Sequence, residues 1–179
     1  MRNRNTAGFL YVLFAAVLFS IGGLCIKMVP WNGMAINSAR NIISLLVIGI
    51  YLKVIHHRLT LSPAVLFGAV CMAGTTTLYS LANKMTTAAN TIVLQFTAPI
   101  FVILFTWLFF RKKPQRLDII TVAAVLIGIA FFFIDGLSAG NTAGNVLALI
   151  SGVSYAGVFM MNSFEKSDPL SSVFFGQCI

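Results

Sequence analysis

Residues 34–54 read MAINSARNIISLLVIGIYLKV, a run of mostly apolar side chains whose charges are Arg40 and Lys53. A helix of about 20 such residues crosses the ~30 Å hydrocarbon core of a membrane. Further stretches of this kind lie at residues 7–27, 62–83, 86–110, 117–135 and 143–162. The sequence therefore predicts an all-α fold, a polytopic membrane bundle with six complete transmembrane helices.

The distribution of charge predicts how the chain lies in the membrane. Of its residues 59% are hydrophobic and 9% are charged, which leaves little polar surface for a soluble domain. The net charge is +8, and most basic residues fall in alternate loops, namely Arg2, Arg4, Lys53, Arg58, Arg111, Lys112, Lys113, Arg116 and Lys166. Because cytoplasmic loops are enriched in Lys and Arg, we expect the N-terminus in the cytoplasm. We expect these residues to contact the headgroups of the lipid bilayer, so the positive charge does not indicate a nucleic-acid partner.

A short internal repeat predicts two domains. Thr-Ala-Gly at residues 6–8 recurs at residues 142–144, and five predicted spans separate the two starts. Because five is odd, the second copy must enter the membrane from the opposite face, as in transporters built from inverted repeats. We expect a first five-helix repeat at residues 1–136 and the start of a second, inverted repeat at residues 137–179. The alternative is a chance match.

The last residues predict an incomplete seventh span. Residues 171–179 begin another apolar run, but nine helical residues reach only about 14 Å, roughly half of a membrane. A carboxylate in hydrocarbon is costly. We therefore expect the sequence to be a truncated fragment of a longer inverted-repeat protein, with the missing C-terminal half or a second copy as a further partner.

The sharpest candidate site lies within residues 34–54. Asn37, Arg40, Asn41 and Ser44 are spaced so that they share one helical face. An arginine inside a membrane costs about 2.5–3.5 kcal/mol on insertion scales, so it should face the bundle interior or a watery cavity. One interpretation is a cavity wall on which the guanidinium binds a carboxylate. The other is that Arg40 extends to the membrane interface.

Span 86–110 carries a second polar stripe. Thr87, Thr91 and Gln95 are four residues apart, and Pro99 follows at the next step. Gln95 would either bind substrate or hydrogen-bond a neighbouring helix, and Pro99 is expected to kink the span. Aromatic walls would come from two tyrosines. The predicted substrate-binding residues are Asn37, Arg40, Asn41, Tyr79, Gln95 and Tyr155.

Small residues at four-residue spacing predict close helix packing on three spans. They are Ala69 and Ala73, Ala124 and Gly128, and Ala148, Gly152 and Ala156. The alternative for the last set is a sliding surface between two halves of the protein.

The absence of catalytic and metal-binding motifs limits the classes of function that the sequence supports. No phosphate-binding glycine loop, Cys/His cluster or acidic metal motif is present, so we expect no enzyme, no cofactor and no metal. Cys25, Cys71 and Cys178 are expected to be buried small hydrophobic residues. His56 and His57 are expected to be a solvated pair at the membrane interface.

Residues 88–101, AANTIVLQFTAPIF, together with the arginine near the start of span 34–54 and the Gly128-centred span that leads to Gly144, resemble EamA-type transporters of the drug/metabolite transporter superfamily. The resemblance implies ten helices in two inverted repeats around a central cavity, with alternating access, in the bacterial inner membrane. It also implies secondary active export of small metabolites such as amino acids or other carboxylate-bearing compounds. Family members often carry Gly-Glu after the fourth span, where this chain has basic residues 111–113. The alternative function is an inactive truncated protein or a helical interaction partner without transport.

Overall fold

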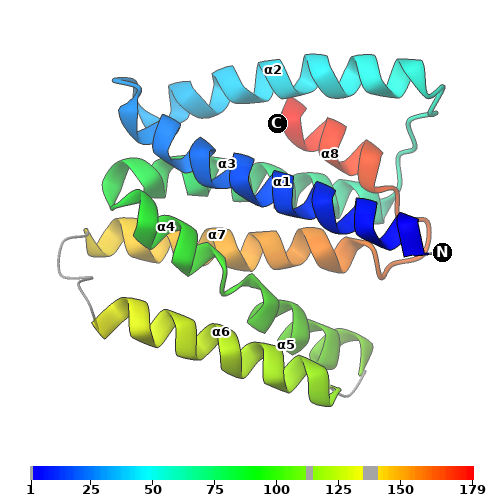
Figure 1. Ribbon diagram of the computed structural model, residues 1–179. Coiled ribbons are helices and arrows are strands. Elements are labelled where there is room, and N and C mark those ends of the chain that lie inside the picture. Colours follow the sequence, from blue (N-terminus) through cyan, green and yellow to red (C-terminus); the bar gives the residue numbers. More distant parts are fainter. Residues whose placement is uncertain (1, 112–114, 135–140) are drawn as a thin grey trace.

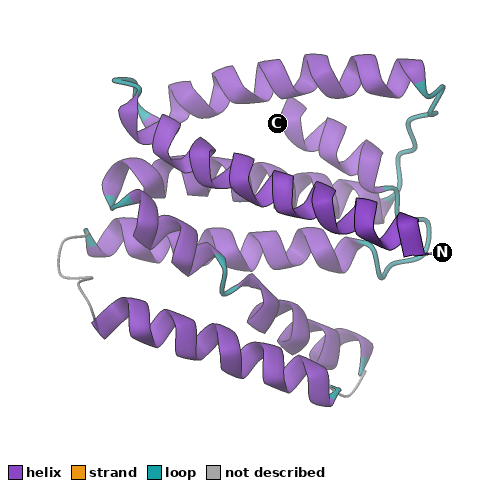
Figure 2. Ribbon diagram, viewed as in Figure 1, coloured by secondary structure: helices purple, strands orange, loops and turns teal. Residues whose placement is uncertain are grey.

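The computed structural model describes residues 2–111, 115–134 and 141–179, and every regular element in these ranges is a helix (Figure 2). In chain order the helices are α1 (Arg2–Met28), α2 (Gly33–Val54), α3 (Pro63–Met85), α4 (Ala88–Gln95), α5 (Ala98–Phe110), α6 (Arg116–Ile134), α7 (Thr142–Met161) and α8 (Pro169–Cys178) (Figure 1). The all-α prediction is confirmed for the described part of the chain.

Four helical segments of the described residues are long and apolar enough to cross a membrane. They are α2, α3, α4 together with α5, and α7. Helices α1 and α6 occupy the other two predicted spans, and α8 occupies the start of the predicted seventh. The structure thus supports a helical membrane bundle, whereas the total of six complete spans plus a partial seventh stays a prediction.

Local capping residues determine where the helices begin. The side chains of Asn32, Ser62, Thr87 and Asn141 each accept a hydrogen bond from a backbone N–H in the first turn of α2, α3, α4 and α7. Asp168 caps α8 in the same way. Such caps satisfy N–H groups that have no partner within the helix.

The predicted kink in the fourth span is a complete break between α4 and α5. Pro99 has no N–H to donate to the Gln95 carbonyl, so the helix cannot continue regularly. The Thr97 hydroxyl donates to the Leu94 carbonyl at 2.7 Å and stabilises the break. Gly152 of α7 lies against it, because a Cβ there would be 3.2 Å from the Gln95 carbonyl oxygen.

Helices α3 and α7 form the centre of the bundle, and α8 and α4 pack against them. The prediction of close packing through small residues is confirmed here, since Ala69 and Ala73 of α3 and Ala148, Gly152 and Ala156 of α7 are buried. On α6 the same prediction is wrong within the described residues. Gly128 is exposed, and no other helix lies within 4 Å of where its Cβ would be.

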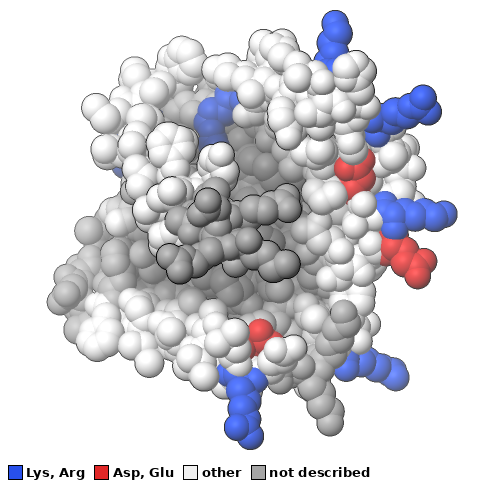
Figure 3. Space-filling model, turned by 45° about the vertical axis from the view of Figure 1, so that its right-hand side comes forward, with Lys and Arg blue, Asp and Glu red and all other residues white. Residues whose placement is uncertain are grey.

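The loops that carry most basic residues share one end of the bundle. In Figure 1 the start of α1, the α2–α3 connection and the α7–α8 connection all lie at the right. Most of the visible Lys, Arg, Asp and Glu side chains project from the right side and lower edge of Figure 3. Helix α1, which contains the Thr-Ala-Gly of residues 6–8, and helix α7, which begins with its repeat, run in opposite directions (Figure 1). The division into two repeats at residue 136 stays a prediction, and residues 135–140 lie outside the described ranges.

The cysteine prediction is corrected by the structure. Cys25 and Cys178 are exposed on the surface of the bundle, and Cys71 is half-buried. The reason is that a membrane helix can present apolar side chains outward to lipid, so an apolar neighbourhood in the sequence does not imply burial within the protein.

Candidate functional site

Two polar residues of α2 face two polar residues of α3. Asn37 Nδ2 donates to Thr77 Oγ1 at 3.0 Å, and Arg40 Nη1 donates to Ser80 Oγ at 3.3 Å. Asn37 and Arg40 are three residues apart on α2, as are Thr77 and Ser80 on α3, so each helix presents its two polar side chains on one face. Asn37 is buried at 6% exposure, whereas Arg40 is exposed at the surface of the bundle.

Tyr79 joins this group from α3. Arg40 is close enough to Tyr79 for the two side chains to interact electrostatically. A Cβ on Gly23 of α1 would lie 2.9 Å from the Tyr79 hydroxyl oxygen. The structure therefore brings together three of the predicted site residues, Asn37, Arg40 and Tyr79, where α1, α2 and α3 meet.

Two buried amide oxygens in this region have no hydrogen-bond partner among the described residues. They are Oδ1 of Asn37 and Oδ1 of Asn83. Asn83 is fully buried, and its Nδ2 donates to the Gly23 carbonyl at 3.3 Å. A buried acceptor without a partner costs about 1–3 kcal/mol, so these two oxygens are poised to accept a hydrogen bond.

The other three predicted site residues are not joined to Arg40 by any hydrogen bond in the described structure. Asn41 is half-buried on the same face of α2, one turn after Asn37. Gln95 is the last residue of α4 and is half-buried. Tyr155 of α7 stacks edge-on against Phe159, with ring centroids 4.8 Å apart. Their role in a substrate cavity stays a prediction.

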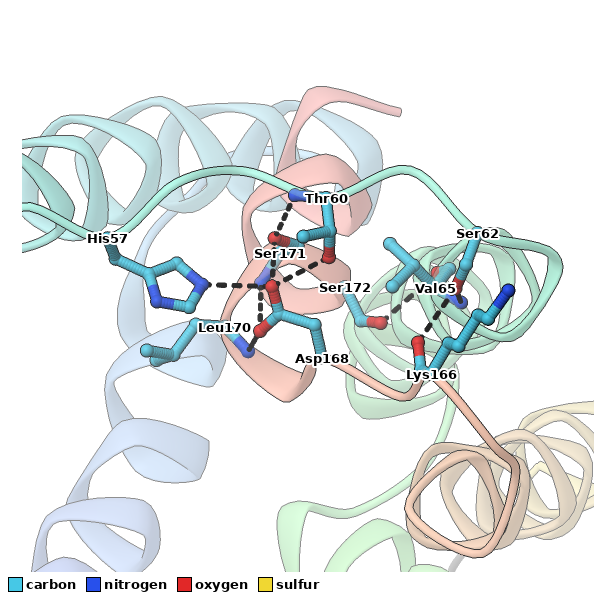
Figure 4. Close-up of polar contacts among 9 residues, drawn as sticks. All are labelled: His57, Thr60, Ser62, Val65, Lys166, Asp168, Leu170, Ser171 and Ser172. Carbon is cyan, nitrogen blue, oxygen red and sulfur yellow. Dashed lines mark hydrogen bonds and ion pairs between the residues drawn. The ribbon is translucent and has the colours of Figure 1, made fainter.

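A second polar group, the Asp168 cluster, consists of His57, Thr60, Asp168 and Ser171 and joins two loops (Figure 4). Asp168 Oδ2 accepts hydrogen bonds from His57 Nε2 and Thr60 Oγ1, each at 2.9 Å, and from Ser171 Oγ. Its Oδ1 accepts from the backbone N–H groups of Leu170 and Ser171. Because a carboxylate only accepts, His57 Nε2 must carry a hydrogen.

The hydrogen bonds decide the charge of Asp168. Desolvation by burial raises the pKa of its carboxyl, but the bonds from Ser171, His57 and Thr60 outweigh this and hold the pKa well below its usual range. The carboxylate therefore stays ionised over the physiological range. The cluster fastens the α2–α3 loop to the α7–α8 loop.

Sequence reasoning missed this cluster. His57 was expected to be solvated, but its side chain is 29% exposed and bonded to Asp168, so that interpretation is wrong. The partners are 111 residues apart in the chain, and no local pattern links them. The one local signal was Asp168-Pro169 as a helix start. His56 is exposed, as expected.

A third polar group, the Asn145 cluster, lies at the other end of α7 and consists of Thr86, Asn90 and Asn145. Asn145 Oδ1 accepts from Thr86 Oγ1 at 2.7 Å and from Asn90 Nδ2 at 3.3 Å. Lys27 of α1 donates to the Thr86 carbonyl at 2.7 Å. The cluster ties the α3–α4 joint to the start of α7.

The described residues hold no group of three or more His, Cys, Asp or Glu side chains that could bind a metal ion. The polar side chains around Arg40 are instead neutral amides and hydroxyls, and Arg40 itself supplies a guanidinium. Such groups bind anions and zwitterions by hydrogen bonding and do not supply a nucleophile with its base.

Comparison with known proteins identifies a family. The sequence model of the EamA-like transporter family matches residues 6–134, which is more than half of the chain. Neither the curated proteins nor the solved structures gave a match to this sequence. The matched range runs from within α1 to the end of α6 and includes Asn37, Arg40, Tyr79 and Gln95.

Proposed function

The chain belongs to the EamA-like transporter family, and on this premise we propose that it exports small carboxylate-bearing metabolites, amino acids above all, across the bacterial inner membrane. Members of this family are multi-pass membrane transporters of the drug/metabolite type. To this family role we add the class of substrate, export as the direction of transport, and an orientation with the N-terminus in the cytoplasm. The basic end of the bundle supports that orientation.

The observation that carries the proposal is that Arg40 has no carboxylate partner among the described residues. The chain has four acidic residues. Asp118, Glu165 and Asp168 lie at the basic end of the bundle, and Asp135 lies outside the described residues. Among the described residues the ion pair is that of His57 with Asp168. A guanidinium at membrane depth without a counter-ion is costly, and a substrate carboxylate would supply one.

The geometry of guanidinium and carboxylate supports this class of substrate. Arginine offers five N–H donors in a planar fork that matches both oxygens of a carboxylate. The bond to Ser80 uses one of them. The remaining donors are available for a bidentate pair, and Tyr79 supplies an adjacent polar hydroxyl.

The preference for amino acids comes from the unpartnered amide oxygens. Asn37 Oδ1 and Asn83 Oδ1 are buried acceptors close to the same helix junction. An α-ammonium group has three N–H donors and would satisfy such oxygens when α2 and α3 separate to admit a substrate. A zwitterion would thus use both the guanidinium and the amides.

Alternating access requires that the two ends of the bundle open in turn. The Asp168 cluster and the Asn145 cluster are the polar fastenings at the two ends of α7. In our proposal one of them releases while the other holds. The closely packed small residues of α3 and α7 form the surface between them.

The experiment is transport of labelled amino acids in proteoliposomes that contain the protein. Arg40→Ala should lower transport of anionic and zwitterionic substrates at least tenfold, because a charge-assisted hydrogen bond contributes about 1.5–3 kcal/mol. Arg40→Lys keeps the charge but loses the bidentate pair, and should lie in between.

The matched control is Arg116→Ala, which removes an exposed arginine at the start of α6. It should transport like the parent protein. Equal transport by Arg40→Ala and the parent, with both proteins folded by circular dichroism, would remove Arg40 from the site and with it the argument for carboxylate substrates.

A further inference from the structure

A cavity of about 540 Å³ lies at the basic end of the bundle, between the end of α2 and helix α8. Its apolar lining includes Gly49 and Leu52 of α2 and Phe174 of α8. Its polar lining includes Lys53, His57 and Arg58. Cavities of roughly 300–1,000 Å³ are the usual size for small-molecule sites.

The way in which α2 ends places the basic residues together. The His56 N–H donates to the Lys53 carbonyl, and the His57 N–H donates to the Leu52 carbonyl at 3.0 Å. His56 adopts a left-handed conformation, with φ 54°. These are the bonds and the conformation of a helix-ending Schellman motif. The chain therefore turns back at once, and Arg58 returns beside the last turn that holds Lys53.

The positive charge of this cavity is not balanced within the described structure. The side chains of Lys53 and Arg58 are exposed, and the ion pair among the described residues is that of His57 with Asp168, so neither cation is paired with a described carboxylate. Asp168 lies behind His57, and its Oδ2 already accepts three side-chain hydrogen bonds. The cavity wall thus presents two unpaired cations and the imidazoles of His56 and His57, which is the chemistry that binds a phosphate oxyanion.

The cavity also spans the boundary between hydrocarbon and water. Helix α2 is long and apolar enough to cross a membrane, and Lys53 lies in its last turn. Gly49 and Leu52 are therefore at the depth of the hydrocarbon edge, and Lys53 and Arg58 are at the depth of the headgroups. A free phosphate would use only the basic half of such a cavity. A phospholipid would use both halves.

We propose that this cavity is a binding site for the phosphate headgroup of an anionic phospholipid. The phosphate lies between Lys53 and Arg58, and the first carbons of the lipid lie against Gly49, Leu52 and Phe174. The site is separate from the Arg40 region and does not depend on which substrate the protein carries. It would anchor the end of α2 and the neighbouring Asp168 cluster to the membrane surface.

The test measures lipid selectivity in vesicles that contain the protein, with spin-labelled phosphatidylglycerol and phosphatidylcholine as probes. The parent protein should prefer phosphatidylglycerol. Lys53→Gln with Arg58→Gln should lower that preference at least tenfold, because the phosphate then loses its charge-assisted hydrogen bonds to both residues. The control, Arg111→Gln with Arg116→Gln, removes the same charge from another loop at the same end and should leave the preference within about twofold.

A second variant distinguishes binding of the lipid in the cavity from a general attraction of anionic lipid to positive charge. A Cβ on Gly49 would meet Phe174 at 3.7 Å, an ordinary contact, so Gly49→Ala should be tolerated. Gly49→Leu fills the cavity without changing the charge, and should lower the preference for phosphatidylglycerol at least fivefold, with Gly49→Ala as its control. An equal loss in the Arg111/Arg116 control, or no loss in Gly49→Leu, would overturn the site.

Inorganic phosphate distinguishes the two sources of a phosphate group. At millimolar concentration it should leave the bound labelled lipid in place, because it lacks the apolar contacts. Complete displacement of the lipid by inorganic phosphate would show a free-anion site and overturn the assignment to a phospholipid.

Discussion

At the scale of single residues, Asp168 shows how one carboxylate organises two distant loops. It caps α8 with Oδ1 and binds His57, Thr60 and Ser171 with Oδ2. Hydrogen bonds to a charged acceptor are about twice as strong as those between neutral groups. The charge on Asp168 therefore matters more to the junction than its shape.

We predict that Asp168→Asn lowers the free energy of unfolding by about 1–3 kcal/mol at pH 7. Asparagine can still cap α8, so the loss reflects the charge-assisted bonds. Thermal unfolding of the purified protein in detergent measures it. Glu165→Gln, an exposed change between α7 and α8, is the control and should change stability by less than about 0.5 kcal/mol.

The same variant has a pH dependence with a definite sign. The pKa of Asp168 is lower in the folded state than in the unfolded chain, so its stabilisation is complete above the unfolded value of about 4 and is lost as the pH falls further. The difference between parent and Asp168→Asn should therefore shrink by about 1 kcal/mol from pH 7 to pH 3. A difference that grows on acidification would contradict the role given to the carboxylate.

Residue spacing within one helix was predictable, and pairing between helices was not. The i, i+3 spacing of Asn37 and Arg40 follows from the sequence and predicts a shared face. That Thr77 and Ser80 lie opposite depends on how α2 and α3 pack. The sequence does show that Thr77 and Ser80 are polar and have the same spacing as Asn37 and Arg40, but many other ways of packing the helices are compatible with that pattern.

At the scale of elements, helix ends and breaks follow from local chemistry. Ser62-Pro63 and Asp168-Pro169 combine a capping side chain with a proline in the first turn, where its missing N–H costs nothing. Pro99 predicted a kink, and the chain breaks into α4 and α5 because Pro99 has no N–H to donate, while Thr97 satisfies the Leu94 carbonyl beside the break. Contacts of α6 were not predictable in this way, because a small-residue face shows only that close packing is possible.

Gly144 gives a test of close packing at the start of α7. A Cβ there would lie 2.9 Å from the Thr86 backbone nitrogen and from the Met85 and Thr86 Cβ atoms, so rigid atoms would have to move. We predict that Gly144→Ala lowers the free energy of unfolding by about 1–3 kcal/mol. Thermal unfolding in detergent measures this effect.

Gly128→Ala is the matched control, because no described atom outside α6 lies within 4 Å of where a Cβ on Gly128 would be. It should be neutral or should stabilise α6 by about 0.5–1 kcal/mol, since alanine favours a helix over glycine. Equal stability of the two variants would show that α7 does not pack against the α3–α4 joint as described.

At the scale of the whole molecule, α3 and α7 form a central pair with a polar cluster at each end. Helices α4, α5 and α8 pack against this pair. The lengths and positions of the helices were predictable because hydrophobic stretches are local in sequence. The packing of α7 and α8 against α3 was not, because their contacts join residues that are far apart in the chain.

The central claim is that Arg40 faces an aqueous hollow between helices and not the lipid. Labelling of an engineered thiol tests it most directly. In a protein whose three cysteines are replaced, Arg40→Cys and Ile42→Cys are treated with a membrane-impermeant thiol reagent. Ile42 is exposed on a different face of α2, where lipid should cover it. We predict that the thiol at position 40 reacts and the thiol at position 42 does not. A thiol at position 40 that stays unreactive from both sides of the membrane, while the parent protein still transports, would contradict the account.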